Sequence, residues 1–422
     1  MDRKIAEFLD NSVTAFGAVK SIKEELINNG YKELDGKIIK GGKYFVTRND
    51  SSIIAFNVGN TFNNPGLMIA ASHTDCPSFK LKPNPIIKTD LGVKLNVEGY
   101  GDFLTRAWFD RPLSLAGRVM VKTEDGIKSI NYCDDKPFCI IPSMAPHLAR
   151  ELEDKKVDLA VDMLPIVSLN KEYDFKAFLG FKLSVKKEDI LGFDLYLYPV
   201  LKTYYWGEND EFITSHHIDN LECAYTTLMG FIDNFNDENI NIYASFDNEE
   251  VGSLTRQGAD SDFLYLTINR ICDDLGLNYS ELVKNGMLLS CDNAHGIHPN
   301  HPELYDKNNS CELNKGVVIK YNANQSYTSD SLSSSLLIDL MKKNNIDYQV
   351  YANKTGIRGG STLGNLNNRH VSIMSIDIGL AQWAMHSAIE TAGSKDIETM
   401  IKLVKCFYNS KLIINNNTYS LK

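Results

Sequence analysis

The sequence predicts an α/β protein in which one α/β domain is interrupted by a smaller domain rich in β-strands. Two observations support this prediction. On both sides of a central segment, strand-like apolar runs alternate with helical patterns, as in LECAYTTLMGFIDNF followed by INIYASFD after that segment. The middle of the chain instead alternates apolar and polar residues between Gly and Asp turns, as in GVKLNVEGYG. We therefore expect the α/β domain to comprise residues 1–87 and 215–422, and the β-rich insertion to comprise residues 88–214.

The α/β pattern begins with a helix that spans apolar positions from Phe8 to Ile22 and ends with a helix from about Ile397 to Tyr408. Two short strands are expected from Tyr44 to Thr47 and from Ile53 to Asn57. A buried strand from Gly66 to Ala71 then delivers the polar residues SHTD at its C-terminal end, where open α/β sheets usually place their sites. The Asn-rich tail INNNTYSLK is expected to fray.

The composition is that of an ordinary globular protein. The 422 residues, 43% hydrophobic and 23% charged, suffice for two domains with large cores. No apolar run approaches the roughly 20 residues that span a bilayer, and a net charge of -10 without a long basic cluster argues against nucleic acid. The eight cysteines form no CxxC pair, and the N-terminal segment has no apolar signal core. We expect a cytoplasmic protein with reduced thiols and neither a membrane nor a nucleic-acid partner.

Polar residues beside predicted strand and helix ends are the first candidates for chemistry. His73 and Asp75 are separated by one residue, and a metal-binding histidine commonly donates its second ring N–H to a carboxylate. The alternative is a surface histidine beside an unrelated aspartate. Asp219 lies in SHHIDNLE, where a loop becomes a helix, so that its carboxylate could bridge two cations or simply cap the helix.

Carboxylates also follow two further strand-like runs. Glu249 and Glu250 come after INIYASFD, so one could hold a metal while its neighbour reaches the attacking water. The alternative for this pair is a solvated acidic turn. Asp292 follows the apolar run GMLLS. No HExxH, GxSxG, phosphate loop or GxGxxG occurs, which removes the simplest zincin, serine hydrolase, kinase and dinucleotide-binding interpretations.

A second histidine, His386, stands late in the chain in GLAQWAMHSAIE. Met385, Ala388 and Ile389 predict that it lies on the buried face of a helix, where a lone histidine is more often a hydrogen-bonded core residue than a ligand. The joint pattern changes this interpretation, because two histidines and three carboxylates supply three ligands per metal if one aspartate bridges. Such nitrogen and oxygen ligands suit zinc, and manganese or cobalt could substitute.

The order of these motifs, HTD, DNL, NEEVGS, DNAHGIHPN and a late AMHS, together with WFDRPLSLAGRV and GGSTLG, resembles the aspartyl aminopeptidase family. This family is a branch of the co-catalytic di-zinc aminopeptidases. The resemblance covers nearly the whole chain. It implies a zinc-peptidase-like α/β/α catalytic domain interrupted by a β-rich oligomerisation domain, and a homo-oligomer such as the family's tetrahedral dodecamer. It also implies hydrolysis of the N-terminal residue of peptides, with a preference for Asp or Glu, by a two-metal-activated water.

The resemblance also implies roles for single residues. The ligands of one zinc are His73, Asp219 and Asp292, those of the other are Asp219, Glu250 and His386, Asp75 orients His73, and Glu249 is the general base. The residues implied to contact substrate are Lys320, Gly359, Gly360 and, from a neighbouring subunit, His147.

Two positions depart from the family pattern: His217 stands where an arginine is common, and Val13 where a proline is usual. Neither is a ligand, so the departures leave only fine specificity open. Two rival functions also remain open at this point. Metal ligands do not encode the substrate, so a deacylase or carboxypeptidase-like hydrolase could use the same site. A catalytically idle scaffold is the rival from another class, although an idle site has no need for the intact ligand set and Glu249.

Overall fold

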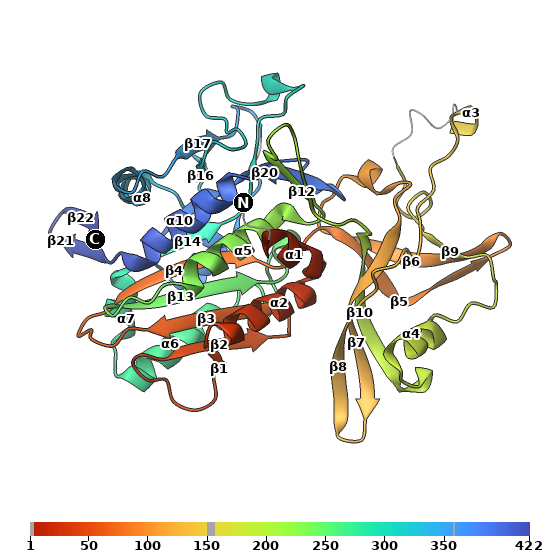
Figure 1. The fold of residues 1–422 in the computed structure, drawn as a ribbon, viewed down its shortest axis with the longest axis horizontal. Helices are drawn as coiled ribbons and strands as arrows, with labels where there is room; N and C mark the ends of the chain where they lie inside the picture. The colour runs from red at the N-terminus through yellow and green to blue at the C-terminus, as the bar shows by residue number, and fades with distance from the viewer. Residues whose placement is uncertain (1–3, 150–156, 358) are drawn as a thin grey trace. The chain divides into compact units, whose positions relative to one another are not determined.

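The structure of the chain is a computed structural model that describes residues 4–149, 157–357 and 359–422. It divides into two compact units (Figure 1). The first comprises Met1–Asp75, Thr203–Met385 and Glu390–Lys422, and the second comprises Cys76–Lys202 and His386–Ile389. The second unit begins earlier than the predicted insertion, because strand β5 (Ser78–Thr89) belongs to its sheet. It ends earlier too, because β11 (Tyr204–Trp206) and β12 (Phe212–Ser215) belong to a sheet of the first unit.

A nine-stranded mixed sheet, in the order β1-β2-β3-β13-β4-β14-β18-β16-β17, forms the centre of the first unit. Four of its nine strands, β13, β4, β14 and β18, are neighbours and run parallel to one another. All residues of β13, β4 and β14 are buried, as expected for strands covered on both faces. The strands are β1 (Lys32–Glu33), β2 (Lys43–Arg48), β3 (Ser52–Val58), β4 (Gly66–His73), β13 (Asn239–Phe246), β14 (Gly286–Cys291), β16 (Val317–Tyr321), β17 (Tyr348–Ala352) and β18 (Met374–Gly379).

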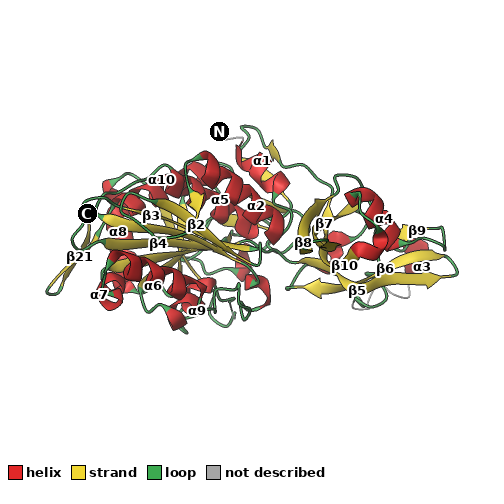
Figure 2. Cartoon of the chain, turned by 90° about the horizontal axis from the view of Figure 1, so that it is seen from below, coloured by secondary structure: helices red, strands yellow, loops and turns green. Residues whose placement is uncertain are grey.

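Helices cover both faces of this sheet: α2, α5 and α10 lie on one face, and α6, α7 and α9 on the other (Figure 2). The predicted α/β/α architecture is therefore confirmed. Some helix starts are set by local capping; Thr14, for example, accepts a hydrogen bond from the Gly17 N–H at the start of α2. The helices are α1 (Lys4–Asn11), α2 (Ala15–Asn28), α5 (Ile218–Ile232), α6 (Phe263–Leu275), α7 (Tyr279–Lys284), α8 (Ser331–Lys343), α9 (Leu363–His370) and α10 (Asp396–Asn409).

A five-stranded sheet of the first unit shows that one sequence-based expectation is wrong. Its order is β11-β12-β20-β19-β15, where β15 is Ala294–His295, β19 is Ala381–Trp383 and β20 is Glu390–Gly393. His386 lies in the turn between β19 and β20, not on a helix, and its φ of 64° is left-handed. The apolar spacing that suggested a helix has another cause, since Ala388 is buried in the core of the second unit.

The C-terminal tail is also ordered, contrary to expectation. Strands β21 (Leu412–Asn415) and β22 (Thr418–Leu421) pair as an antiparallel hairpin. Leu412 and Leu421 are buried at its open end, so apolar burial holds a segment whose composition suggested fraying.

The second unit is a six-stranded antiparallel sheet in the order β8-β7-β10-β5-β6-β9, with its own apolar core around Trp108. Asp194 of this sheet pairs with Lys80 and Arg118, each at 2.9 Å. Over the described residues, no helix of either unit is long and apolar enough to cross a membrane. The elements are β5 (Ser78–Thr89), β6 (Gly92–Tyr100), β7 (Leu113–Thr123), β8 (Gly126–Cys133), α3 (Pro146–Ala149), β9 (Ile166–Ser168), α4 (Phe175–Leu183) and β10 (Ile190–Pro199).

Candidate metal centre and active site

The carboxyl ends of three adjacent parallel strands define the site. β4 ends at His73, which pairs in register with Phe246, the last residue of β13. β14 lies on the other side of β4, and Asp292 follows its last residue. Because parallel strands end at the same edge of a sheet, polar residues that follow each strand meet there although they are far apart in sequence.

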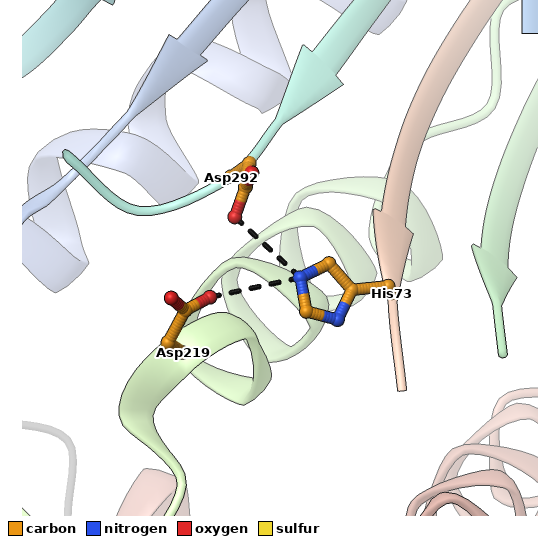
Figure 3. A group of neighbouring side chains, drawn as sticks. All are labelled: His73, Asp219 and Asp292. Atoms are coloured by element: carbon orange, nitrogen blue, oxygen red, sulfur yellow. Dashed lines mark ion pairs between the residues drawn. The ribbon is translucent and has the colours of Figure 1, made fainter. Parts of the chain in front are cut away.

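His73, Asp219 and Asp292 form the first group of potential ligands (Figure 3). The Nε2 atom of His73 lies 3.6 Å from Asp219 Oδ1 and 3.6 Å from Asp292 Oδ1. All three residues are buried, and Asp219 enters from the first turn of α5, where its φ and ψ are not helical. One imidazole nitrogen and two carboxylate oxygens that converge in this way are a donor set that zinc accepts.

Glu249 and Glu250 join the same histidine in a second group, in which ligand atoms of His73, Glu249 and Glu250 all lie within 4.8 Å of one another. Both glutamates belong to a short 3-10 helix, Glu249–Val251, that follows β13. The left-handed Asn248, at φ 64°, turns the chain sharply between strand and helix.

Asp75 holds both groups in place. Its carboxylate accepts hydrogen bonds from the backbone N–H of Glu249 at 3.1 Å and of Glu250 at 3.2 Å. The Nδ1 atom of His73 lies 3.0 Å from the Asp75 carbonyl oxygen and 3.4 Å from its Oδ1. These acceptors favour a proton on Nδ1, which leaves the lone pair of Nε2 directed at Asp219 and Asp292. Sequence reasoning found the link to His73 but missed the link to the glutamates.

The charge of the site fits a bound cation. In the protein alone, burial and then repulsion from a neighbouring carboxylate raise the pKa of Asp219 and of Glu250 above their usual values. Burial acts on Asp292 in the same direction, but Lys320 and His73 outweigh it and lower its pKa. Several buried carboxylates around one imidazole are costly without a positive counter-charge, so this donor set suits divalent metal ions.

Lys320 lies inside this arrangement and is not a solvated residue at a strand end. It is 2% exposed, and its ammonium donates to the carbonyl oxygens of Asp292 at 2.9 Å and of Asn293 at 3.2 Å. Its Nζ also lies 3.7 Å from Asp292 Oδ2 and 5.1 Å from the ring centroid of Tyr327. Burial lowers the pKa of Lys320, but Asp292, Tyr327 and Asp377 among its neighbours together outweigh burial, and the pKa rises above its ordinary value.

The remaining predicted residues come from other segments of the chain. Gly359 and Gly360 line a cavity of about 260 Å³ in the first unit, together with His295, Tyr305, Tyr351, Asn353 and Lys354 among others. His147 is exposed on α3 of the second unit. His386 is the first residue of the four-residue segment that is counted with the second unit.

Sequence reasoning also missed two buried residues, Glu390 and Asn220, that fix the start of α5 around Asp219. The Asp219 N–H donates to Glu390 Oε2 at 2.9 Å, and the Asn220 side-chain amide donates to the Cys291 carbonyl at 2.8 Å. Nothing in the local sequence around Glu390 or Asn220 signals these contacts, because each joins segments that are distant along the chain.

An α/β/α fold that gathers histidine and carboxylates at the carboxyl ends of parallel strands defines a metal-dependent hydrolase. Comparison with known proteins specifies the class. The profile of the family described as Aminopeptidase I zinc metalloprotease (M18) matches residues 8–408. The chain belongs to this M18 family and is a zinc-dependent aminopeptidase.

Relatives and solved structures agree with this assignment. The probable M18 family aminopeptidase 2 of Clostridium novyi (strain NT) is 39% identical over 426 residues, covering 96% of this chain and 98% of the relative. A cryo-EM structure of a complex of Ape4 and Nbr1 is similar with a TM-score of 0.91 and 32% identity, covering 96% of this chain and 85% of that one. The structure of the S. cerevisiae mApe1 dodecamer has a TM-score of 0.85 and 26% identity, covering 96% and 95%.

The contacts of Asp75 generate a prediction. Asp75→Asn replaces one carboxylate oxygen by an amide NH₂ group, which cannot accept a hydrogen bond. One of the two backbone N–H groups of Glu249 and Glu250 then loses its acceptor, and the contact with His73 is weakened. We expect metal affinity to fall by about 10- to 100-fold, as for other residues that orient metal ligands. Competition with a zinc chelator measures this. Asp339→Asn on the surface of α8 is the control, and equal affinity in the two variants would contradict the prediction.

Proposed function

We propose that the protein is a two-zinc aminopeptidase that removes N-terminal residues from peptides, Asp or Glu by preference, with Glu249 as the general base. The observation that carries this proposal is the buried convergence of carboxylates on His73 at one sheet edge. Two metal ions need more ligand atoms than a single ion does, and the side chains at this sheet edge are the proposed source of these atoms.

In this proposal Asp219 would contribute to holding both ions. His73 and Asp292 would hold one of them with it, and Glu250 and His386 would hold the other. Chain connectivity supports the place of His386: it lies in the turn between β19 and β20, and Glu390 at the start of β20 accepts a hydrogen bond from the Asp219 N–H. When bound, two zinc ions polarise the scissile carbonyl and lower the pKa of a water molecule, and manganese or cobalt can serve in their place.

Glu249 is the residue proposed to move the proton. Its side chain is partly buried, and its backbone N–H is fixed by Asp75, so the carboxylate has a defined position beside the ligand Glu250. Burial raises the pKa of Glu249 to about 8 in the protein alone, although His73 opposes this shift. A carboxylate whose pKa lies near neutral pH can take the proton of the attacking water and return it to the leaving amine nitrogen.

Lys320 is the proposed source of the preference for acidic residues. An ammonium has three donors, and two of them bond to the carbonyls of Asp292 and Asn293. The third makes no hydrogen bond to the described residues, although Nζ also lies 3.7 Å from Asp292 Oδ2, and it is the donor proposed to bind an Asp or Glu side chain of the substrate. Gly359 and Gly360 are the proposed wall of the same pocket, since they line a cavity without side chains that would fill it.

The second unit is proposed to assemble the protein as a homo-oligomer. Leu91, Leu148, Leu169 and Phe181 of this unit are each 72% to 88% exposed, and an interface that covered them would remove apolar surface from water. The similar S. cerevisiae mApe1 forms a dodecamer. We propose a comparable, tetrahedral dodecamer in the cytoplasm, in which His147 reaches a neighbouring subunit's active site.

Glu249→Gln tests the assignment of the base. The variant should keep about two zinc ions per chain by elemental analysis, while turnover falls by roughly 10² to 10⁴, the usual contribution of general acid/base catalysis. Glu250→Gln should instead lose metal. Chelation should abolish wild-type activity, and zinc, manganese or cobalt should restore it. Near-normal turnover of Glu249→Gln would exclude this residue as the base.

Lys320→Ala tests the acidic preference. Removal of the ammonium should lower kcat/KM for aspartyl and glutamyl substrates more than for alanyl ones, by an amount that corresponds to about 2 to 5 kcal/mol for a lost buried charge pair. Alanyl substrates should also lose some rate, because Lys320 holds Asp292, so the ratio of the two losses is decisive. Lys343→Ala on the surface of α8 is the control. Equal losses for both substrate classes would remove Lys320 from specificity.

His147→Ala tests the role across subunits. The variant should bind metal normally and lose activity, because each active site would lack the neighbour's imidazole. Mixed with Glu249→Gln after dissociation and reassembly, it should regain part of the activity, since some sites would combine an intact Glu249 with an intact His147. If reassembled mixtures stay inactive, His147 does not act in trans.

A further inference from the structure

Asp377 is a fully buried carboxylate of β18 to which sequence reasoning gave no role. It lies on a central strand between β14 and β16, pairs in register with Ser290, and belongs to none of the potential metal groups found among the described residues. A buried carboxylate is expensive unless its oxygens accept hydrogen bonds. The hydrogen-bond partners of Asp377 therefore identify the segments that this carboxylate fixes.

The side chain of Asp377 joins two loops. Oδ2 accepts hydrogen bonds from the backbone N–H of Thr328 at 2.6 Å and from its hydroxyl at 2.7 Å, and Oδ1 accepts from the hydroxyl of Thr362. The backbone reinforces the first link, since the Asp377 N–H donates to the hydroxyl of Ser329 at 3.0 Å. These two loops are the only segments that this carboxylate contacts by hydrogen bonds within the described part of the chain.

The first loop leads to Lys320. Thr328 follows Tyr327, whose ring lies 5.1 Å from the Lys320 ammonium, and that ammonium contacts Asp292. The aromatic face stabilises the cation and restricts where it can point. Fixing Thr328 to Asp377 therefore fixes the wall against which Lys320 rests.

The second loop carries Gly359 and Gly360. Thr362 stands at the N-cap of α9, but its side chain makes no capping hydrogen bond to described residues; its hydroxyl is directed at Asp377, to which it donates. A capping bond normally stabilises a helix start. Its replacement by a bond to the sheet shows that the loop before α9 is anchored to β18.

We propose that Asp377 is a positioning residue for substrate specificity, because one carboxylate fixes both the loop whose Tyr327 supports Lys320 and the loop that carries Gly359 and Gly360. This proposal rests on the proposed function, in which Lys320, Gly359 and Gly360 line the pocket of the cleaved residue. The Thr328 N–H can only donate, so an asparagine could hold Thr328 only with its amide N–H₂ turned toward the Thr362 hydroxyl, which would then have to accept. Both links would also lose the negative charge that strengthens them.

Kinetics of Asp377→Asn in the full-length, metal-loaded protein test the proposal. KM for aspartyl substrates should rise by about 10-fold, as expected when hydrogen bonds to a charged group become hydrogen bonds to a neutral one, while zinc content stays at the wild-type level and kcat changes less. Thr362→Val, which removes one donor, should shift KM in the same direction by less. Ser375→Ala is the matched control. It removes a buried hydroxyl from the same strand, and this hydroxyl bonds to Asn368 and Ile373 rather than to either of the two loops.

Amide hydrogen exchange gives a readout that does not depend on substrate. Residues 325–329 and 359–362 should exchange faster in Asp377→Asn than in Ser375→Ala. If Asp377→Asn does not fold, Thr362→Val and Thr328→Val decide by the same two measurements. Equal loss of kcat/KM for acidic and alanyl substrates, or exchange no faster than in the control, would overturn the proposal. A loss of kcat/KM confined to acidic substrates in Asp377→Asn, together with equal losses for acidic and alanyl substrates in Lys320→Ala, would instead contradict the proposed role of Lys320.

Discussion

The concentration of negative charge around His73 is the constraint on which the rest of the structure depends. Asp75, Asp219, Glu249, Glu250 and Asp292 meet at one edge of a sheet, with most of their surface removed from water. Like charges at this distance raise one another's pKa unless cations offset them. The protein supplies one such cation itself, Lys320, and the zinc for which the M18 family is named would supply further positive charge.

The surrounding structure serves to keep these charges in place against their repulsion. Three residues do this, and each acts through the backbone of another segment. Asp75 accepts from two amides of the glutamate turn, Lys320 donates to two carbonyls after β14, and Asp377 accepts from the amide of Thr328. Backbone groups have fewer degrees of freedom than side chains, so a potential ligand whose backbone is fixed has a defined orientation without a metal. The strands thus position the potential metal ligands, while Asp377 holds the loops next to Lys320 and before α9.

The fold class and most of the site could be predicted because their signals are local. A buried strand followed at once by polar residues is visible in SHTD and in FDNEE, and the parallel sheet brings such strand ends together. The helix predicted around His386 was wrong for the opposite reason. Apolar spacing of three and four residues there reflects burial of Ala388 in a different unit, which periodicity cannot distinguish from a helical face. The tail was misjudged because two buried leucines outweigh its polar composition.

The sequence by itself determined the architecture, the chemistry of the donor set and the family, because strand periodicity and motif order are properties of short segments. Only the tertiary structure decided which buried groups support that chemistry. Asp75 reaches the glutamate turn 174 residues later, and Glu390 reaches Asp219 171 residues earlier. Asp377 holds Thr328, 49 residues away in the chain, and Thr362, 15 residues away. Hydrogen bonds between segments leave no local pattern, since their geometry exists only once the sheet has brought the partners within about 3 Å.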